Sequence, residues 1–431
     1  MPDTSPPATP RLASTDRLAE FHTVASRNYI AHGIEGGLFM GGLAFVAVNS
    51  VLPRLADKLN APAWVTSLTP VLLMMGFALP TVFTAHWVEK QHRVMPVLLF
   101  TGVFQRIPYL IAGLILLLRP ADHIALWVVV LTPLISGLAG GFIATAWQEL
   151  VAKTVKPTRR SSVFAIRNVL ATGIGLVAGI VIGRVLERYP GMRGFGILHL
   201  ICFGFLVLSY IAFSRIRETR QKPRDHHTHA SLLQNLKAMP GIVARDRVFR
   251  TFLVARATSN AVFIVVPFMA IHALAVTGRP DAFLGSLVTA QMIGGILGNV
   301  FAGYVGDKHG TRTVALIGST LLAAMTVTAL FASTTWAFVA VFFALGLAQF
   351  VEKIGRQTMG IEISPFNKRS TYLALISFIN VPSMLTASVI SATLWDTTRS
   401  FTVLGVTAAL LLGMTTLLYL RLPEPRSMAR E

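Results

Sequence analysis

The chain has 431 residues, of which 53% are hydrophobic and 13% charged, a composition that excludes a string of soluble domains and fits a multi-pass membrane protein. The formal net charge of +19 does not indicate nucleic-acid binding, because the basic residues fall in loops between apolar runs. The single cysteine, Cys202, excludes a disulfide framework and a cysteine metal site.

Apolar runs of about 20 residues recur along the chain, and each is long enough to cross a hydrocarbon core of about 30 Å. The polar, Pro-rich start, Met1–Asn28, contains no apolar stretch typical of a cleavable signal peptide. Twelve spans are expected, near Tyr29–Leu52, Trp64–Ala85, Met95–Leu118, Ile124–Glu149, Val163–Val185, Phe195–Phe213, Thr251–Val276, Phe283–Val305, Thr313–Phe331, Trp336–Lys353, Tyr372–Leu394 and Phe401–Leu420.

The positions of Lys and Arg predict the orientation of these spans. With the N-terminus in the cytoplasm, 28 of the 38 basic residues lie in inner segments and 8 in outer loops. The positive-inside rule therefore places both termini in the cytoplasm. A plasma membrane, the inner membrane of a bacterium, is the expected location.

One long connection, residues 214–250, divides the spans into two groups of six. It carries nine basic residues and a predicted amphipathic helix along the inner membrane surface, with an apolar face of Leu232, Leu233, Leu236 and Met239. The predicted organisation is a cytoplasmic tail (1–28), a six-helix bundle (29–213), this linker (214–250), a second six-helix bundle (251–420) and a cytoplasmic tail (421–431).

A polar stretch between the eighth and ninth spans predicts a tight hairpin between two helices. Two of its glycines permit close helix approach, its aspartate suits the positive N-terminus of a nearby helix, and a third glycine suits positive φ. Two basic residues favour a cytoplasmic loop. In chain order these residues are Gly303, Gly306, Asp307, Lys308, Gly310 and Arg312.

The pattern Gly-x-x-x-Asp-Lys-x-Gly-x-Arg resembles the signature loop of the major facilitator superfamily of secondary transporters. In that family the loop has a sister copy between helices 2 and 3. A degraded counterpart lies 218 residues earlier, where Glu89 stands in the place of Asp307, beside Lys90 and Arg93.

The resemblance implies an all-α membrane protein whose twelve transmembrane helices form two pseudo-symmetric six-helix bundles. It also implies a central cavity, alternating access, and a role for both hairpins as a conformational latch. In the family, spans 1, 4, 7 and 10 line the cavity, and span 3 mostly supports them.

Two charges lie deep within predicted spans. Arg106 in span three either clamps an anionic substrate or pairs with Glu35 in span one, and Glu35 is a candidate protonatable coupling group. Their depths differ by roughly 9 Å at a rise of about 1.5 Å per residue, a gap that long side chains only partly close. A structural ion pair and a role in coupling or substrate binding both remain open.

Charges near the cytoplasmic ends of spans four, seven and ten resemble the inner gate of the superfamily. They are Glu149, Arg256, Glu352 and Arg356. Because Glu352 and Arg356 are four residues apart, a simple pair within one helix is the alternative.

Uncharged polar groups inside the spans are candidates for the cavity lining, namely Asn49, Asn260, Gln291 and Asn380. Hydrogen bonds between helices are the alternative for each. The glycines at 175, 179 and 183 form a stripe that favours close helix packing. The histidines at 226, 227 and 229 lie in a basic loop without a second ligand cluster, so no metal site is expected.

These patterns predict a secondary active transporter that moves a small organic solute by alternating access. We expect a monomer in the lipid bilayer that is not an enzyme and has no cofactor, with protons as the coupling ion. The low charge of the spans favours export of an amphiphilic or drug-like compound. The alternatives are a small organic-anion transporter that uses Arg106, and a non-transporting sensor or scaffold with a transporter fold.

Overall fold

A computed structural model describes residues 12–89, 93–156, 159–218, 240–365 and 368–425. The described elements are helical, and their bounds are α1 Leu12–Leu43, η1 Ala44–Val46, α2 Val51–Lys58, α3 Ala63–Glu89, α4 Met95–Leu117, α5 Asp122–Thr154, α6 Arg160–Arg188, α7 Met192–Ser214, α9 Arg247–Ser259, α10 Val262–Thr277, α11 Phe283–His309, α12 Thr311–Phe331, α13 Thr335–Ile363, α14 Arg369–Thr398 and α15 Phe401–Arg421.

The lengths of these helices match the expected spans. Eleven segments of the described chain are long and apolar enough to cross a membrane. The remaining span is α3, a helix of 27 residues whose first part is a shorter apolar segment. At about 1.5 Å per residue it extends roughly 40 Å, enough to cross the bilayer.

Two of the spans are broken where the sequence analysis expects continuous helices. The first span passes through η1 and a turn at residues 48–50 before α2 begins, so Asn49 lies in the break. The α-helical hydrogen bonding of the seventh span is interrupted between α9 and α10, at Asn260 and Ala261, where the backbone stays in the right-handed helical region but forms tighter i to i+3 bonds. Asn side chains compete for backbone hydrogen bonds and favour such interruptions.

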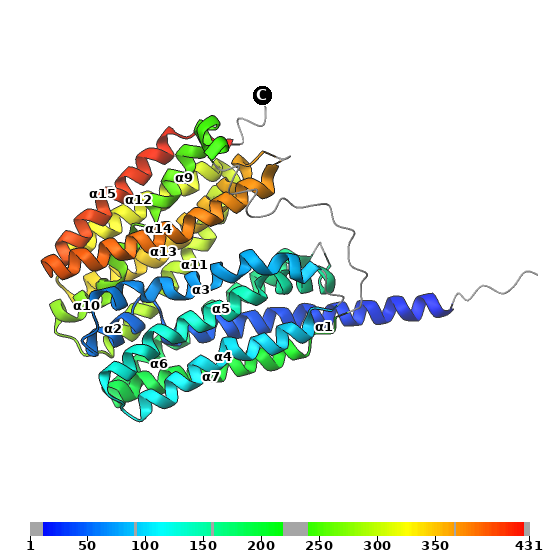
Figure 1. Ribbon diagram of the computed structural model, residues 1–431, viewed down its shortest axis with the longest axis horizontal. Helices are drawn as coiled ribbons and strands as arrows, with labels where there is room; N and C mark the ends of the chain where they lie inside the picture. The colour runs from blue at the N-terminus through cyan, green and yellow to red at the C-terminus, as the bar shows by residue number, and fades with distance from the viewer. Residues whose placement is uncertain (1–11, 90–92, 157–158, 219–239, 366–367, 426–431) are drawn as a thin grey trace, which may run out of the picture.

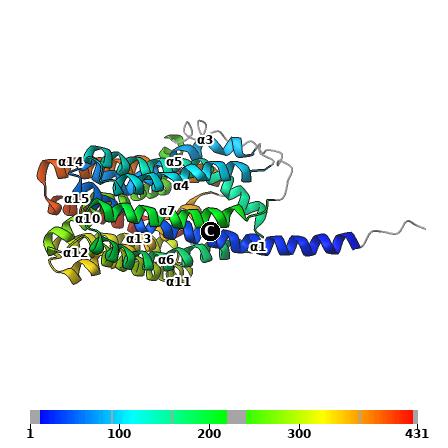
Figure 2. The same cartoon turned by 90° about the horizontal axis from the view of Figure 1, so that it is seen from below.

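The helices form two bundles, α1–α7 and α9–α15 (Figures 1 and 2). Within the first bundle, glycines of α1 lie against α6, where side chains added at Gly33 and Gly41 would collide with Ile166 and Ile174. Between the bundles, α6 packs on α11 and α3 packs on α14. The buried core extends through both bundles.

The two bundles are close at one end and diverge toward the other (Figure 1). We call the close end, where α2 and α10 pack together, the α2 end. The opposite end carries the turn at Gly310 between α11 and α12, and we call it the hairpin end. The molecule is therefore closed at its α2 end.

Part of the predicted organisation lies outside the described residues. This holds for Lys90, for the histidines at 226, 227 and 229, and for the apolar face at Leu232, Leu233, Leu236 and Met239. Only the backbone of Glu89, at the end of α3, is described.

Candidate functional site

A cavity of about 220 Å³ lies between the two bundles. The broken spans reach it from both sides, Val48 and Asn49 from the first bundle, Ser259 and Asn260 from the second. Breaks in transmembrane helices free backbone groups for a ligand and occur at the binding sites of transporters. The cavity is thus built at equivalent positions of the two halves.

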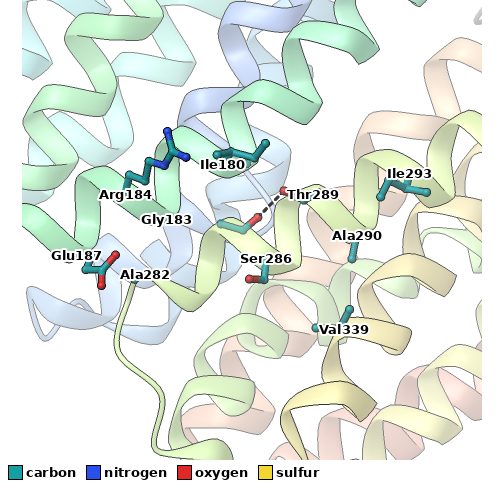
Figure 3. A pocket seen from close by; sticks show the side chains of 12 residues that line it. Ile180, Gly183, Arg184, Glu187, Ala282, Ser286, Thr289, Ala290, Ile293 and Val339 are labelled. Carbon is teal, nitrogen blue, oxygen red and sulfur yellow. Dashed lines mark hydrogen bonds between the residues drawn. The ribbon is translucent and has the colours of Figure 1, made fainter.

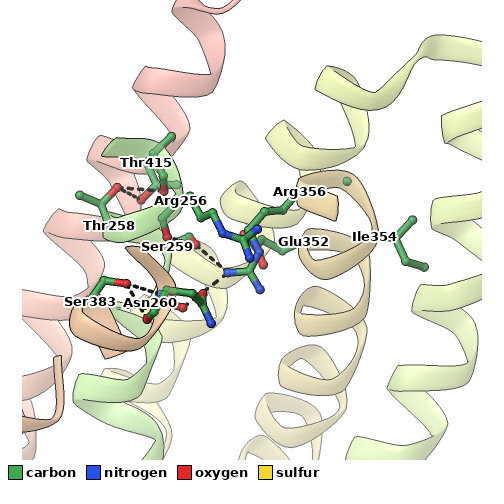
Figure 4. A network of polar contacts seen from close by, with 12 residues as sticks. Arg256, Thr258, Ser259, Asn260, Glu352, Ile354, Arg356, Ser383 and Thr415 are labelled. Carbon is green, nitrogen blue, oxygen red and sulfur yellow. Dashed lines mark hydrogen bonds and ion pairs between the residues drawn. The ribbon is translucent and has the colours of Figure 1, made fainter. Parts of the chain in front are cut away.

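A network of polar side chains forms the second-bundle wall of the cavity (Figure 4). The amide of Asn260 donates to Asn380 Oδ1 at 3.3 Å and to Ser383 Oγ at 2.7 Å. The guanidinium of Arg356 donates to Ser259 Oγ at 3.2 Å and to Asn260 Oδ1 at 3.5 Å. These bonds hold α9, α13 and α14 together around the cavity.

Two glutamines bridge α11 and α13 beside this network. Gln291 donates to Gln349 Oε1 at 3.2 Å, and Gln349 lines the cavity. Of the four predicted polar lining residues, Asn49 and Asn260 line the cavity. Asn380 and Gln291 instead hydrogen-bond to residues of the lining, as the alternative interpretation expects.

Charged residues of the same wall come from α13 and α9. Glu352, Lys353 and Arg356 line the cavity, and Arg256 points toward Arg356 beside Glu352 (Figure 4). Glu352 Oε1 and Arg356 Nε are 3.5 Å apart, the pair within one helix that the sequence spacing allows. Lys353 is exposed, while Glu352 is buried.

Arg106 lies elsewhere, inside the first bundle and outside the cavity lining. Its guanidinium donates to Leu206 O at 2.9 Å, Gly102 O at 2.7 Å and Ser209 Oγ at 3.3 Å. It also stands over the ring of Tyr210, at 5.1 Å from the centroid. The hypothesis of an Arg106–Glu35 ion pair is wrong, because backbone carbonyls of α4 and α7 take up its donors.

Glu35 pairs with a residue of the predicted fifth span that the sequence analysis did not single out. Arg167 Nη1 of α6 lies 2.6 Å from Glu35 Oε2, and both side chains are nearly buried. Arg167 also stands 4.5 Å from the centre of the Trp147 ring. The buried His32 bonds Thr154 Oγ1 at 2.9 Å one turn away. The i, i+3 spacing of His32 and Glu35 on α1 was the available signal for this cluster.

The predicted inner gate shows no ion pair between the bundles among the described residues. Glu149 pairs with Lys153 within α5, and Glu352 pairs with Arg356 within α13. The two bundles diverge at this end (Figure 1).

The inter-bundle ion pairs that the structure describes lie at the α2 end. Arg54 Nε and Lys58 Nζ of α2 contact the two carboxylate oxygens of Asp281, at 2.8 and 2.7 Å. Asp281, between α10 and α11, is 9% exposed, so these pairs are partly shielded from water. Arg54 also pairs with Asp57. The sequence analysis counted these residues only as loop charges.

The hairpin is tighter than expected, because α11 continues to His309 and Gly310 alone separates it from α12. Gly310 has a φ of +88°, as predicted for the turn. Gly303 does not serve a close approach, since a Cβ built there meets nothing within 4 Å. At Gly306 the added Cβ makes only an ordinary contact with Val314.

The described contacts of the hairpin fix it to its own bundle. Arg312 donates to Tyr419 O at 3.1 Å and Leu420 O at 2.7 Å, at the end of α15. Lys308 Nζ donates to Tyr304 OH at 2.6 Å. Asp307 lies in the last turn of α11.

Each bundle has an acid that caps the N-terminus of its third span. Glu424 accepts from the amides of Thr311 and Arg312 at 3.1 and 3.2 Å. Glu218 accepts in the same way from Val94 and Met95 at 3.0 and 2.9 Å, beside the exposed Arg93. A carboxylate at a helix N-terminus is favourable. The sequence analysis assigned this role to Asp307 and missed both glutamates.

The glycine stripe of α6 packs against α11 at the α2 end (Figure 3). A Cβ on Gly179 would collide with Thr289, whose hydroxyl donates to Gly285 O at 2.9 Å. Beside this contact a groove of about 500 Å³ carries Arg184 and Glu187. The stripe therefore supplies a close contact between the bundles.

No cluster of metal-binding side chains occurs in the described part of the chain.

A family model for the Major Facilitator Superfamily matches residues 34–278 and 251–431. The chain belongs to this superfamily. No curated protein matches the chain. Membership in this superfamily, together with the two bundles, makes the chain a multi-pass membrane transporter.

Solved structures of other superfamily transporters share its fold. The nucleoside transporter NupG aligns with a TM-score of 0.72 and 10% identity over 91% of this chain and 99% of its own. A bacterial homologue of the lysosomal transporter Spinster, in an inward-facing and unoccupied conformation, aligns with a TM-score of 0.61 and 13% identity over 94% of this chain and 98% of its own. A POT family transporter in complex with 5-aminolevulinic acid aligns with a TM-score of 0.64 and 10% identity over 92% of this chain and 94% of its own. At these identities the likeness shows the fold alone.

Proposed function

We propose that this chain is a secondary active transporter that binds a small organic solute in the cavity between its bundles and moves it by alternating access. The observation that carries the proposal is the cavity itself, which the two bundles line at their equivalent helix breaks. The protein acts as a monomer in a bacterial plasma membrane, with the hairpin end and both termini in the cytoplasm. On this assignment the structure is inward-facing.

Asp281 is the central residue of the outer gate in this proposal. Two cations of α2, Arg54 and Lys58, hold it in the described state. Opening the outer side separates Arg54 and Lys58 from Asp281. Each partly shielded pair contributes on the order of 1 kcal/mol, which sets the size of the expected effect.

The test follows the accessibility of a cavity residue from each side of the membrane. In a Cys202→Ser background, Val48→Cys provides one reporter thiol in the cavity for a membrane-impermeant maleimide. Adding Asp281→Asn weakens the outer gate, so the rate of labelling from the outer side rises by about tenfold. A tenfold change corresponds to a shift of about 1.4 kcal/mol in the balance between the two states. Labelling from the cytoplasmic side falls.

A matched control is Asp396→Asn, because Asp396 pairs with Arg399 at the end of α14 and does not bridge the bundles. It leaves the labelling rates unchanged. Equal rates in the Asp281→Asn and unmodified proteins would contradict the gate, and a thiol that never reacts from the outer side would contradict alternating access. The latter result favours the non-transporting sensor or scaffold.

The solute class differs from the amphiphilic or drug-like compound that the sequence favoured. That expectation assumes a cavity with few charges, yet one acid and two basic residues line it. Drug-sized ligands occupy pockets of about 300–1,000 Å³, whereas this one has about 220 Å³. Proton coupling remains part of the proposal, with the Glu35–Arg167 pair as its candidate site.

A further inference from the structure

The charges around the cavity do not balance. Arg256, Lys353 and Arg356 supply three positive charges, and Glu352 supplies the one negative charge that faces them in the described chain. The second-bundle wall therefore carries a net charge of about +2. The described wall of the first bundle is neutral, consisting of Val48, Asn49, Pro70 and Met74.

Hydrogen-bond donors in this cluster are left without acceptors. In the described part of the chain, Arg256 Nε, Arg356 Nε and Glu352 Oε1 are buried and make no hydrogen bond. Glu352 approaches Arg356 at 3.5 Å, too far for a strong charge-assisted bond. One carboxylate at this distance does not satisfy two guanidinium groups.

The alternative role for these residues is a structural ion pair within α13. Among the described residues that pair accounts for Glu352 and Arg356, and it leaves Arg256 and Lys353 with no ion pair of their own. Arg106 shows how the same fold satisfies a purely structural arginine. Arg106 donates hydrogen bonds to two carbonyls and a hydroxyl, whereas the buried Arg256 Nε donates to no acceptor in the described part of the chain. An unbalanced charge within the membrane is costly and indicates a functional site.

We infer that the cavity binds a small organic anion, whose carboxylate or phosphate group is held between Arg256, Lys353 and Arg356. The inference rests on the proposed function and names the substrate class of the same site. Guanidinium groups present parallel donors that match both kinds of anion, and an ammonium adds a point charge. Binding the anion supplies the charge and the acceptors that the wall lacks.

The rest of the cavity restricts the size of the anion. Met74, Phe263 and Phe350 give it apolar walls, and the amides of Asn49 and Gln349 supply the uncharged polar contacts. A volume of about 220 Å³ excludes a large amphiphile. The site therefore fits a compact anion with a short, partly apolar remainder.

Isothermal titration of the full-length protein in lipid nanodiscs tests the inference. The probes are benzoate, succinate and glycerol phosphate, each beside its uncharged analogue, benzamide, succinamide and glycerol. Tetraphenylphosphonium serves as the amphiphilic cation. We expect at least one anion to bind and its uncharged analogue to bind at least about tenfold more weakly. The carboxylate and phosphate arms distinguish the two kinds of anion.

Single substitutions then place the bound anion in the cavity. Arg356→Gln and Lys353→Gln each raise the Kd of the anion by about tenfold or more, because each removes one cation that faces it. Glu352→Gln removes the like charge and lowers the Kd. The matched control is Arg184→Gln, which removes an exposed arginine of α6 and changes the Kd by less than about twofold.

Three results would overturn the inference. They are the absence of binding by every anion of the series, binding of an uncharged analogue as tight as that of its anion, and a Kd that is unchanged in both Arg356→Gln and Lys353→Gln. Thermal unfolding of each variant establishes that it is folded. The two cavity variants provide separate tests if one of them does not fold.

Exchange of the bound anion across proteoliposomes separates this inference from the proposed function. If the anion binds at the cluster and is not exchanged, the proposal of transport is contradicted and the anion site is supported. If tetraphenylphosphonium or an uncharged analogue is exchanged and no anion binds, the proposal of transport is supported and the anion site is contradicted.

Discussion

Arg106 shows how a charge inside a membrane bundle is satisfied without a counter-ion. Its three guanidinium nitrogens donate to carbonyls of α4 and α7 and to the hydroxyl of Ser209. The depth of this arginine in its span can be read from the sequence, but the direction of its side chain cannot. Direction depends on the rotation of α4 against α7, which is set by packing over both whole helices.

We predict that Arg106→Met destabilises the protein and leaves ligand binding intact. Each charge-assisted hydrogen bond contributes about 1.5–3 kcal/mol to the free energy of unfolding. Removing the charge from the membrane interior offsets this loss by about 2.5–3.5 kcal/mol. For three such bonds the difference lowers the free energy of unfolding by roughly 1–6 kcal/mol. Thermal unfolding in nanodiscs measures this, beside Arg184→Gln as the exposed control. If Arg106→Met instead causes a large rise in the Kd of an anion that the cavity binds, the hypothesis that Arg106 clamps the substrate is supported.

The two broken spans illustrate what sequence shows at the scale of an element. Their lengths and hydropathy are those of continuous spans, so the sequence analysis placed Asn49 and Asn260 inside helices. The breaks bring both residues to one cavity, at equivalent positions of the two bundles. Equivalence of the halves was visible in the repeated hairpin, but the interruption of a helix by a few residues is a local effect that hydropathy over about 20 residues averages away.

The hairpin is the element whose chemistry the sequence indicated best, although the sequence did not reveal the residue that caps α12. The positive φ of Gly310 follows from the pattern, whereas the carboxylate that caps α12 comes from Glu424, beyond α15. A partner 113 residues away has no local signal. The latch hypothesis for this hairpin now involves the ties to α15 as well.

We predict that Gly310→Ala is strongly destabilising. Its backbone lies in a region that only glycine adopts easily, at a cost of about 1–3 kcal/mol for other residues. A Cβ would also collide with the Glu424 carboxylate and displace this cap. Together these effects lower the free energy of unfolding by roughly 2–4 kcal/mol, as measured by thermal unfolding.

Gly303→Ala is the matched control for this substitution. It lies within α11 with nothing near its Cβ, so alanine there is neutral or stabilises by up to about 1 kcal/mol. Equal effects of the two substitutions would contradict the distinction between the two glycines.

At the scale of the whole molecule, function depends on the movement of one bundle against the other. Contacts at the α2 end join the bundles through Asp281 and through the glycines of α6 and α11. The cavity lies between the bundles, so any movement that opens the α2 end changes which side reaches it. The proposed coupling to protons would act on this balance.

We predict that Glu35→Gln abolishes coupling to protons without abolishing exchange. A gradient of one pH unit is worth about 1.4 kcal/mol, so a carrier that moves one proton with each solute accumulates the solute by about tenfold. Glu35→Gln reduces this ratio to about one, while exchange at equal pH continues. The measurement uses the anion that binds best, loaded into proteoliposomes.

Removing Glu35 alone leaves Arg167 buried and unpaired, which destabilises by about 3–5 kcal/mol. The double variant Glu35→Gln/Arg167→Gln removes both charges and separates coupling from stability. Accumulation that survives in a folded Glu35→Gln or double variant would exclude the pair as the coupling site.

The sequence by itself determined the membrane environment, the number and approximate ends of the spans, the two halves and the turn at Gly310, because hydropathy, periodicity and positive φ are local properties of the chain. It also marked Glu352 and Arg356 as a pair. Only the tertiary structure decided which charges meet. The partners of Arg54 and Lys58, of Glu35 and of the α12 N-terminus lie far away in sequence, and the unbalanced charge of the cavity exists only once α9 and α13 stand side by side.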